Sequence, residues 1–441
     1  MACWVEGVHM TRDETVELFL ECEAERDTAR AAAFAAGKDR DEAEKIAHDA
    51  ARAHWNAWAG SLLAEAKARH RNAHRVDKGE PLDSLERDNE DVENWLQKAA
   101  ADFSRCLFLP RGNTATPAEE VNEKGRLADN PVMRTIELGE QGFHGFDFPG
   151  LADFRGATFS CDASFHSAHF SGGADFRDAK FEGCASFHGT SFSGNADFEN
   201  AIFHSCSSFR EAMFQCKAEF SGIKVERAFY MQCAKFAKVP SFSQADFKQA
   251  PDLDGVGFPL PNFWCSGELD LVPHYRAIRR IAIQGADFGR EQMAFKGEVR
   301  SKRGSEHKPW DLLYWVGLTY DAFSDYGRSI ARPLVIGFLL VYSFAGIHLL
   351  NAGVPFSEWS SVCPTSGAPK AAKAITFSFG NSLPPFIGAS RSDLAKEFFG
   401  QCLAMPGAPE WSSTLQIVQA TYGAVLTFML LLGLRNQFKI K

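Results

Sequence analysis

The residues best placed to do chemistry are three histidines that recur at a fixed interval. His144, His166 and His188 are 22 residues apart, and each directly follows a phenylalanine. Imidazole side chains held close together can bind a metal ion or change their charge near neutral pH. A solvated surface is the commoner reason for such a series, so a metal or pH-sensing site is the alternative interpretation of this spacing.

The cysteines suggest thiols rather than a metal centre. The chain has 11 of them, without CxxC pairs or zinc-finger spacing, which is typical of free thiols in a reducing compartment. Cys184 and Cys206 share the 22-residue interval and are expected to be stacked free thiols. Cys363 and Cys402 flank a loop between two apolar segments, and an outward-facing loop would allow them to form a disulfide. Two unrelated thiols are the alternative for this pair.

The sequence gives no support to several other functional classes. It contains no nucleophile paired with a base, no phosphate-binding loop and no paired carboxylates above chance. We therefore expect neither an enzyme nor a bound cofactor. The net charge of −9 over 441 residues produces no strong field, so no nucleic-acid partner is expected.

The histidines lie in a phenylalanine repeat that must set their positions. The stretch ADFRGATFSCDASFHSAHFSGGADF, residues 152–176, spaces its phenylalanines alternately by five and six residues. An α-helix would scatter these rings around its axis, whereas residues two apart on an extended chain share one face. Ser, Gly, Asp, Asn and Cys fill the intervals and favour turns. We therefore predict a β-solenoid with these core residues: Phe154, Phe159, Phe165, Phe170, Phe176, Phe181, Phe187, Phe192, Phe198 and Phe203.

The segments ADFRGATF, ADFRDAKF, ADFENAIF and QADF resemble pentapeptide repeats, a family that forms a right-handed, four-sided β-helix. The resemblance covers about residues 143–258, with a fragment at 101–108. The usual family repeat has five residues and a central Leu, whereas here the centre is Phe and every second unit has a sixth residue. We therefore predict about five coils of about 22 residues, each rising ~4.8 Å, with a bulge at one or two corners.

Helical segments are predicted on both sides of the repeat, so the fold class is multidomain α + β. Residues 1–100 are rich in Ala, Glu, Arg and Lys and form a helical lobe. The solenoid occupies 101–260, and a helical cap or linker at 261–308 covers its open end. Residues 309–332 are aromatic and amphipathic, which is typical of a helix in the membrane interface, and 333–441 form a membrane domain.

Two apolar segments predict the membrane spans. Residues 333–350 and 415–434 have lengths of 18 and 20 residues and carry no formal charge. Each is long enough to cross a bilayer, although a buried core helix is the alternative for the first. Basic residues flank both segments, so the positive-inside rule places both termini in the cytoplasm. We expect a two-span protein of a bacterial-type inner membrane.

A shorter apolar segment at about 371–387 is predicted to be re-entrant. The order helix, re-entrant helix, helix resembles two-span tetrameric ion channels of the potassium-channel type. Some membrane-bound pentapeptide-repeat proteins of bacteria are similar from DYGRS to LRNQFK. The channel resemblance implies a pore helix at about 371–379, but TVGYG is absent, so selective potassium conduction is not expected. The pore-like segment comprises Phe377, Ser378, Phe379, Gly380, Asn381, Ser382, Leu383, Pro384 and Pro385.

Two functional interpretations follow from these patterns. The first is a membrane-anchored scaffold that presents a cytoplasmic β-helix to an unknown protein partner. The alternative is a homo-oligomeric, channel-like pore or gating protein of four chains, with the solenoid as its cytoplasmic sensor. Both have the lipid bilayer as a partner. Some soluble pentapeptide-repeat proteins mimic DNA, but the acidic and basic residues of this repeat are too nearly balanced for that role.

Overall fold

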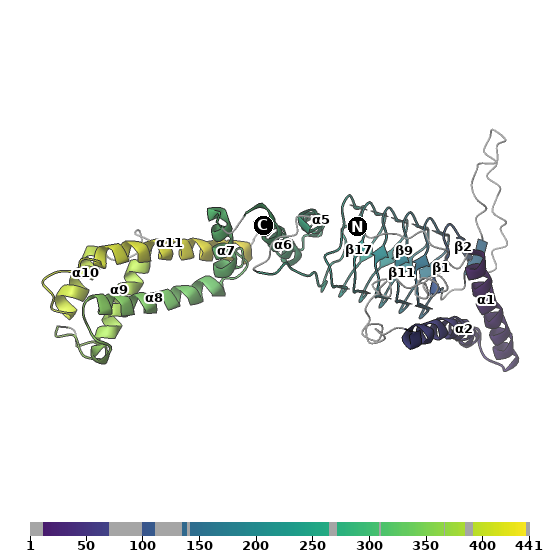
Figure 1. Ribbon diagram of the computed structural model, residues 1–441, viewed down its shortest axis with the longest axis horizontal. Helices are drawn as coiled ribbons and strands as arrows, with labels where there is room; N and C mark the ends of the chain where they lie inside the picture. Colours follow the sequence, from purple (N-terminus) through teal and green to yellow (C-terminus); the bar gives the residue numbers. More distant parts are fainter. Residues whose placement is uncertain are drawn as a thin grey trace, which may run out of the picture. The chain divides into compact units, whose positions relative to one another are not determined.

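The computed structural model describes residues 12–69, 99–110, 135–138, 142–263, 271–307, 310–365, 367–383 and 391–437. The chain divides into two compact units, Met1–Lys302 and Arg303–Lys441. The first unit contains a β-solenoid with helices before and after it, and the second contains two long apolar helices (Figure 1).

The solenoid is built mostly from two-residue strands, because each repeat supplies one short extended step before the chain turns. Strands of successive coils pair in parallel and form four sheets, one along each face. The first sheet contains β1 (Ala101–Asp102), β5 (Ala152–Asp153), β9 (Ala174–Asp175), β13 (Ala196–Asp197) and β17 (Ala218–Glu219). The second contains β3 (Thr135–Leu138), β2 (Leu107–Pro110), β6 (Thr158–Phe159), β10 (Lys180–Phe181), β14 (Ile202–Phe203), β18 (Lys224–Val225) and β21 (Asp246–Phe247). The third contains β7 (Ala163–Ser164), β11 (Ala185–Ser186), β15 (Ser207–Ser208) and β19 (Phe229–Tyr230), and the fourth contains β4 (Asp147–Phe148), β8 (His169–Phe170), β12 (Ser191–Phe192), β16 (Met213–Phe214) and β20 (Lys235–Phe236).

The strand register confirms the predicted length of the coil. Ala152 pairs with Ala174, and Phe181 pairs with Phe203, so equivalent positions are 22 residues apart. Two of the sheets contain five strands, in agreement with about five turns. The fragment at 101–108 belongs to the same stack, because Ala101 pairs with Ala152.

Two kinds of corner explain why the repeat alternates between five and six residues. The five-residue units contain a tight turn, closed by a hydrogen bond such as that from the Ala157 N–H to the Phe154 carbonyl oxygen, 3.1 Å. The third residue of this turn is left-handed, with a φ of 62° at Gly156. The six-residue units bend more widely, as at 160–162. The additional residue therefore lies at two of the four corners of each coil.

The phenylalanine rings fill the solenoid and stack from coil to coil. The ring centroids of Phe154 and Phe176 are 4.8 Å apart with parallel planes, and Phe159 stacks on Phe181 at the same distance. Since this separation equals the spacing of strands, the register that pairs the backbone also stacks the rings. All ten predicted core phenylalanines are fully buried.

Helices α1 (Arg12–Ala35) and α2 (Arg40–Arg69) close the N-terminal end of the solenoid (Figure 1). The Asp102 N–H donates to Thr15 Oγ1 at 3.0 Å, and Trp55 Nε1 donates to the Asp147 carbonyl oxygen at 2.8 Å. Asn56 accepts from the Asp147 N–H through Oδ1 at 2.9 Å. These side chains form hydrogen bonds with backbone N–H and carbonyl groups at the strand edges, where a further coil would otherwise have supplied the partners. The two described helices of the predicted helical lobe therefore cap the solenoid, and residues 1–11 and 70–98 of that prediction lie outside the described part of the chain.

Helices α5 (Leu271–Gln284) and α6 (Phe288–Glu306) follow the last coil. Gln284 Nε2 donates to the Phe247 carbonyl oxygen at 3.0 Å, and the Tyr275 hydroxyl donates to the Pro259 carbonyl oxygen at 2.7 Å. Ile278 and Ile281 of α5 are buried against the core of the solenoid. Polar contacts and apolar packing thus cover this end in the same way as the first.

The second unit is helical in its described residues. Its elements are α7 (Leu312–Ser324), α8 (Ala331–Asn351), the 3-10 helix η2 (Phe356–Glu358), α9 (Lys370–Ser382), α10 (Arg391–Ala395), the π-helix η3 (Lys396–Cys402) and α11 (Ser412–Gln437). Both α8 and α11 are long and apolar enough to cross a membrane. A smaller apolar core, which includes Leu349, Phe377 and Phe398, joins α8, α9 and η3.

Candidate functional site

The predicted histidine series forms a continuous row of rings along one corner of the solenoid, with an edge-to-face contact between His144 and His166 and a stacked contact between His166 and His188. The ring centroids of His144 and His166 are 4.7 Å apart, and those of His166 and His188 are 4.8 Å apart. The 22-residue register places the three rings at the same position of successive coils. His48 of α2 extends the stack, because its ring lies 5.7 Å from that of His144.

The cap fixes the protonation of the first rings of this stack. His48 Nε2 lies 2.9 Å from the His144 carbonyl oxygen, which can only accept, so Nε2 carries a proton. Burial lowers the pKa of His48 to about 4. Burial, and then the neighbouring His166, also lower the pKa of His144. A second proton on either ring is therefore opposed by the environment that the cap creates.

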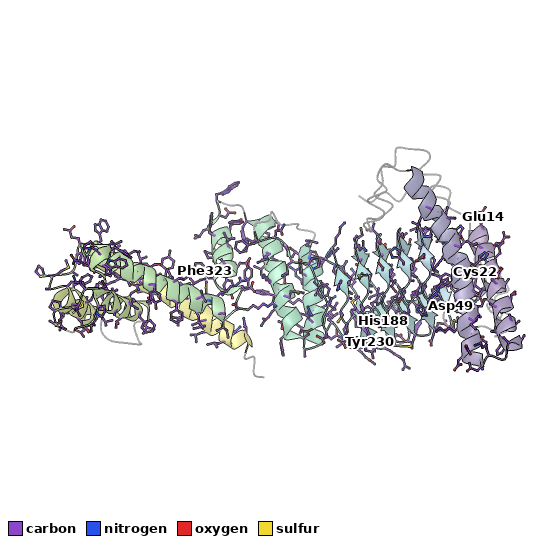
Figure 2. The ribbon with its side chains drawn as sticks, turned by 90° about the horizontal axis from the view of Figure 1, so that it is seen from below. Glu14, Cys22, Asp49, His188, Tyr230 and Phe323 are labelled. Carbon is purple, nitrogen blue, oxygen red and sulfur yellow. A yellow bond between two sulfur atoms is a disulfide. The ribbon has the colours of Figure 1, made fainter. Side chains whose placement is uncertain are left out.

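The other end of the stack meets charged and aromatic side chains. His188 Nε2 lies 3.9 Å from Glu211 Oε2, and the Arg210 guanidinium lies 4.5 Å from the ring centroid of Tyr230. His188 and Tyr230 are on the same side of the solenoid (Figure 2). In the described part of the chain, no group of three His, Cys, Asp or Glu side chains could hold a metal ion. The metal interpretation of the histidine series therefore gains no support, whereas the predicted close approach of its rings is present.

A second column combines buried carboxylates with arginines. Asp175 is fully buried, and Arg177 Nη2 lies 2.7 Å from its Oδ2. Arg155 Nε lies 3.4 Å from the same carboxylate. The next carboxylate in the column, Asp197, has Glu199 in place of the arginine, and burial raises its pKa to about 6. The repeat ADFR contains the signal for this column, because its Asp and Arg are two residues apart on one side of the turn.

Two pairs of cysteines are joined by disulfides. Cys363 and Cys402, the pair that flanks the loop between the apolar helices, have Cα atoms 4.6 Å apart. Cys184 and Cys206 are also bridged, with Cα atoms 4.8 Å apart. The prediction of stacked free thiols for Cys184 and Cys206 is therefore wrong. Adjacent coils bring equivalent Cα atoms within the range of disulfide geometry, which the 22-residue interval already implied.

The second unit contains a buried polar cluster between α8, α9 and α11. His348 Nε2 donates to Gln419 Oε1 at 3.1 Å, and Gln419 Nε2 donates to Ser378 Oγ at 2.7 Å and to Ser382 Oγ at 2.8 Å. His348, Ser378 and Gln419 are at most 1% exposed. Among the described residues, His348 Nδ1 and both amide atoms of Asn381 are buried without a hydrogen-bond partner.

The pore-like segment lies mainly within α9. This helix continues to Ser382, three residues beyond the predicted pore helix, so Gly380 and Asn381 are helical rather than part of an extended filter. The segment divides by burial: Phe377, Ser378 and Asn381 face the interior, whereas Phe379 is 51% exposed. Leu383 follows the helix in an extended conformation, and Pro384 and Pro385 lie outside the described residues.

The carboxyl end of α9 meets the middle of both long helices. Ser378 Oγ donates at 2.7 Å to the carbonyl oxygen of Val341, the central residue of α8. Gly423 lies near the middle of α11, where an added Cβ would be only 2.0 Å from the Ser382 carbonyl oxygen. A cavity of about 160 Å³ lies between these helices, with apolar walls and with Ser382 and Gln419 among its lining residues.

Sequence reasoning did not identify His348 and Gln419 as members of a site. Both are polar residues inside predicted spans that otherwise consist mostly of apolar side chains. A polar or ionisable residue within a membrane helix is itself a signal, because it must find partners inside the helix bundle. What the sequence could not supply was the partner, since Ser378 and Gln419 are 41 residues apart.

The four parallel sheets and the continuous ring stacks define a β-solenoid protein. Residues 143–184 and 176–224 match a family model described as pentapeptide repeats (9 copies). This part of the chain is therefore a pentapeptide-repeat array, in a form whose coil has 22 residues. No curated protein and no solved structure matches the chain.

Proposed function

We propose that this protein is a membrane-anchored scaffold that presents its pentapeptide-repeat solenoid in the cytoplasm for protein interaction. The observation that carries the proposal is the apolar exterior of α8 and α11. Phe338 of α8 and Phe428 of α11 are each 61% exposed, and similar side chains surround them. Water does not solvate such a surface, whereas the hydrocarbon of a bilayer does.

The construction of the solenoid supports a binding role rather than catalysis. Phenylalanine rings occupy its described interior, and helices cover both ends, so its chemistry is confined to the lateral columns. The side chains of His144, His166 and His188, and those of Arg155 and Arg177, recur every 22 residues on that surface. Solenoid proteins commonly use such extended regular surfaces to bind other proteins.

Anchoring and topology can be tested on the full chain in bacterial cells. We expect the protein to remain in the membrane fraction after carbonate extraction. A reporter inserted after Gly367 should behave as periplasmic, and the same reporter at the N-terminus should behave as cytoplasmic. Extraction by carbonate would overturn the anchoring, and a cytoplasmic signal after Gly367 would overturn the two-span topology.

The protein-interaction role needs a separate test. Proximity labelling from the N-terminus should identify the same neighbours in repeated experiments, and charge reversal of Asp197 and Glu199 should remove at least one of them. Reversal of Asp393, an exposed acidic residue of the second unit, is the matched control. An identical set of neighbours in all three proteins would exclude this column as the binding surface.

A channel-like function is the second candidate, and the position of α9 favours it. A helix whose carboxyl end lies halfway along both spanning helices has the placement of a pore helix, and its dipole would favour cations there. The protein would then have to be a ring, of four chains in the two-span plan. A monomeric mass in detergent together with the absence of current in planar bilayers would exclude this function.

A further inference from the structure

The beginning of α7 exposes a broad apolar surface. The opposite side of the helix is buried through Leu318, Asp321 and Ser324. A large exposed apolar patch usually marks an interaction site. The patch residues are each between 52% and 78% exposed: Trp310, Leu312, Leu313, Trp315 and Val316.

A buried ion pair fixes the direction in which this surface points. Arg303 Nη1 lies 3.2 Å from Asp321 Oδ2 and 2.9 Å from the Tyr326 hydroxyl, and both members of the pair are at most 3% exposed. Because breaking such a pair would leave a buried charge without compensation, α7 cannot easily rotate to bury its apolar side. The patch therefore remains outward in the second unit.

The turn after α7 joins this helix to one end of the two long helices. Asp325 and Tyr326 have left-handed φ angles of 53° and 56°, a conformation that non-glycine residues adopt only when the surroundings hold them. Asn436 Nδ2 of α11 donates to the Gly327 carbonyl oxygen of this turn at 3.1 Å. The end of α7, the start of α8 and the end of α11 consequently meet.

Three arginines are concentrated at this meeting point. Arg328 directly follows the turn, Arg332 is in the first turn of α8, and Arg435 is adjacent to Asn436. Arg332 Nη1 lies 3.6 Å from Asp325 Oδ1. Arg328 and Arg435 are exposed, and neither forms an ion pair with another described residue. This end of the helices therefore has a net positive charge.

The opposite end of the same helices carries charges that largely neutralise one another. Lys370 Nζ lies 3.1 Å from Glu358 Oε2, and Lys373 Nζ lies 2.6 Å from Glu397 Oε1. The positive charge is thus confined to the end at which α7 presents its tryptophans and leucines. Aromatic side chains beside cationic ones are the usual composition of a surface at the lipid headgroup level.

We infer that the α7 patch and the three arginines form a docking surface for an anionic phospholipid bilayer. The inference rests on the proposed membrane anchoring. Trp310, Leu313 and Trp315 lie at the boundary between headgroups and acyl chains, and the arginines bind the lipid phosphates beside them. Leu334, Val335 and Phe338 at the start of α8 are also exposed, so the same bilayer would contact them.

Lipid selectivity can be measured on the full chain in phosphatidylcholine bilayers. The association of spin-labelled phosphatidylglycerol is compared with that of spin-labelled phosphatidylcholine. Each arginine near an anionic surface contributes about fivefold, so the double variant Arg328→Gln with Arg435→Gln should lose roughly 30-fold of the preference. Lys396→Gln, at the opposite end of the helices, is the matched control and should keep it. Equal preference in the double variant and the wild type would overturn the inference.

Two further measurements separate the possible sources of failure. Brominated lipids should quench a smaller fraction of the tryptophan fluorescence when Trp315 is replaced by phenylalanine. An unchanged quenched fraction would show that Trp315 of the patch does not contact lipid. Inorganic phosphate should not displace the labelled phosphatidylglycerol, and displacement would assign the arginines to free phosphate instead. A chain that resists carbonate extraction but shows no lipid preference contradicts this inference alone, whereas a chain that carbonate extracts contradicts the anchoring itself.

Discussion

Acidification is expected to release the N-terminal cap from the solenoid, because His48 must be neutral in the capped state. Burial lowers the pKa of His48 to about 4, compared with about 6.5 for an exposed histidine. The released state therefore binds more protons, and the stability of the cap falls as the pH falls through this interval. One pKa unit corresponds to about 1.4 kcal/mol, so the loss is about 2 kcal/mol at pH 5 and about 3 kcal/mol once His48 is fully protonated.

Neighbouring groups decide how much of this effect is local. His144 and His166 have lowered pKa values and add losses of the same sign. Arg26 and Arg52, which lie near His48, also oppose its protonation. The raised pKa values of Asp147 and Asp197 act in the opposite direction, because the folded form of each carboxyl takes up a proton more readily. Asp197 lies in the coils beyond the cap, but Asp147 contacts α2 directly. A local measurement on the cap, compared with a variant that lacks only the His48 imidazole and keeps Asp147, therefore isolates the His48 effect.

Hydrogen exchange followed by mass spectrometry provides that local measurement. The Asp147 N–H is bonded to Asn56 Oδ1, so its exchange reports release of α2. Between pH 7.5 and pH 5 we expect protection at Asp147 and in α2 to decrease, after labelling times are scaled for the intrinsic pH dependence. The variant His48→Gln keeps a donor for the His144 carbonyl oxygen but does not titrate, so its protection should depend less on pH. If wild type and variant lose protection equally, the assignment to His48 is refuted.

Three further predictions concern packing, charge and crosslinking. Gly172→Ala would place a Cβ 2.4 Å from backbone atoms of the preceding coil and should destabilise the solenoid by about 3 kcal/mol in thermal or urea unfolding. Gly60→Ala in α2, where nothing lies within 4 Å, is the control and should stabilise by about 0.5–1 kcal/mol. Arg177→Met removes the nearer of the two arginines beside the buried carboxylate of Asp175 and should cost about 2 kcal/mol, and the added change Asp175→Leu should restore most of the loss. Cys402→Ala opens a disulfide that spans 39 residues and should lower the stability of the second unit by about 4 kcal/mol, whereas an unchanged melting temperature would show that the bridge does not constrain the loop.

The coil length and the core could be predicted because they depend on local periodicity. Alternation of five and six residues between phenylalanines gives a 22-residue coil, and this number fixes which side chains stack. The ring of His166 between those of His144 and His188 follows from the same number. The backbone conformation of each corner was harder to predict from the sequence. Left-handed residues such as Glu211 are not glycine, and their neighbours hold them in this conformation.

The caps and the polar cluster could not be predicted because their partners are distant in sequence. Trp55 and Asn56 bond to backbone atoms about 90 residues away, and nothing in the helical pattern of α2 indicates this role. His348 and Gln419 are 71 residues apart and meet only when the two apolar helices pack. Periodicity can assign a residue to a helix face, but it does not identify which backbone edge or amide that face will meet.

Because the interior of the solenoid is filled, a partner of the solenoid would have to bind along its lateral columns. In the column of Asp153, Asp175 and Asp197, the charge changes from one end to the other. Asp153 and Asp175 are each followed two residues later by an arginine, whereas Asp197 is followed by Glu199 and has only a 3.8 Å contact with Arg177 of the preceding coil. An extended partner segment that follows the column would therefore meet neutral ion pairs near the N-terminal cap and a net negative charge farther along. Because strand spacing sets the repeat at ~4.8 Å, a β-like segment with basic side chains toward one end would match both the spacing and the polarity. The same segment in reverse would place its cations beside Arg155 and Arg177, so a partner of this kind would be expected to bind in one direction only.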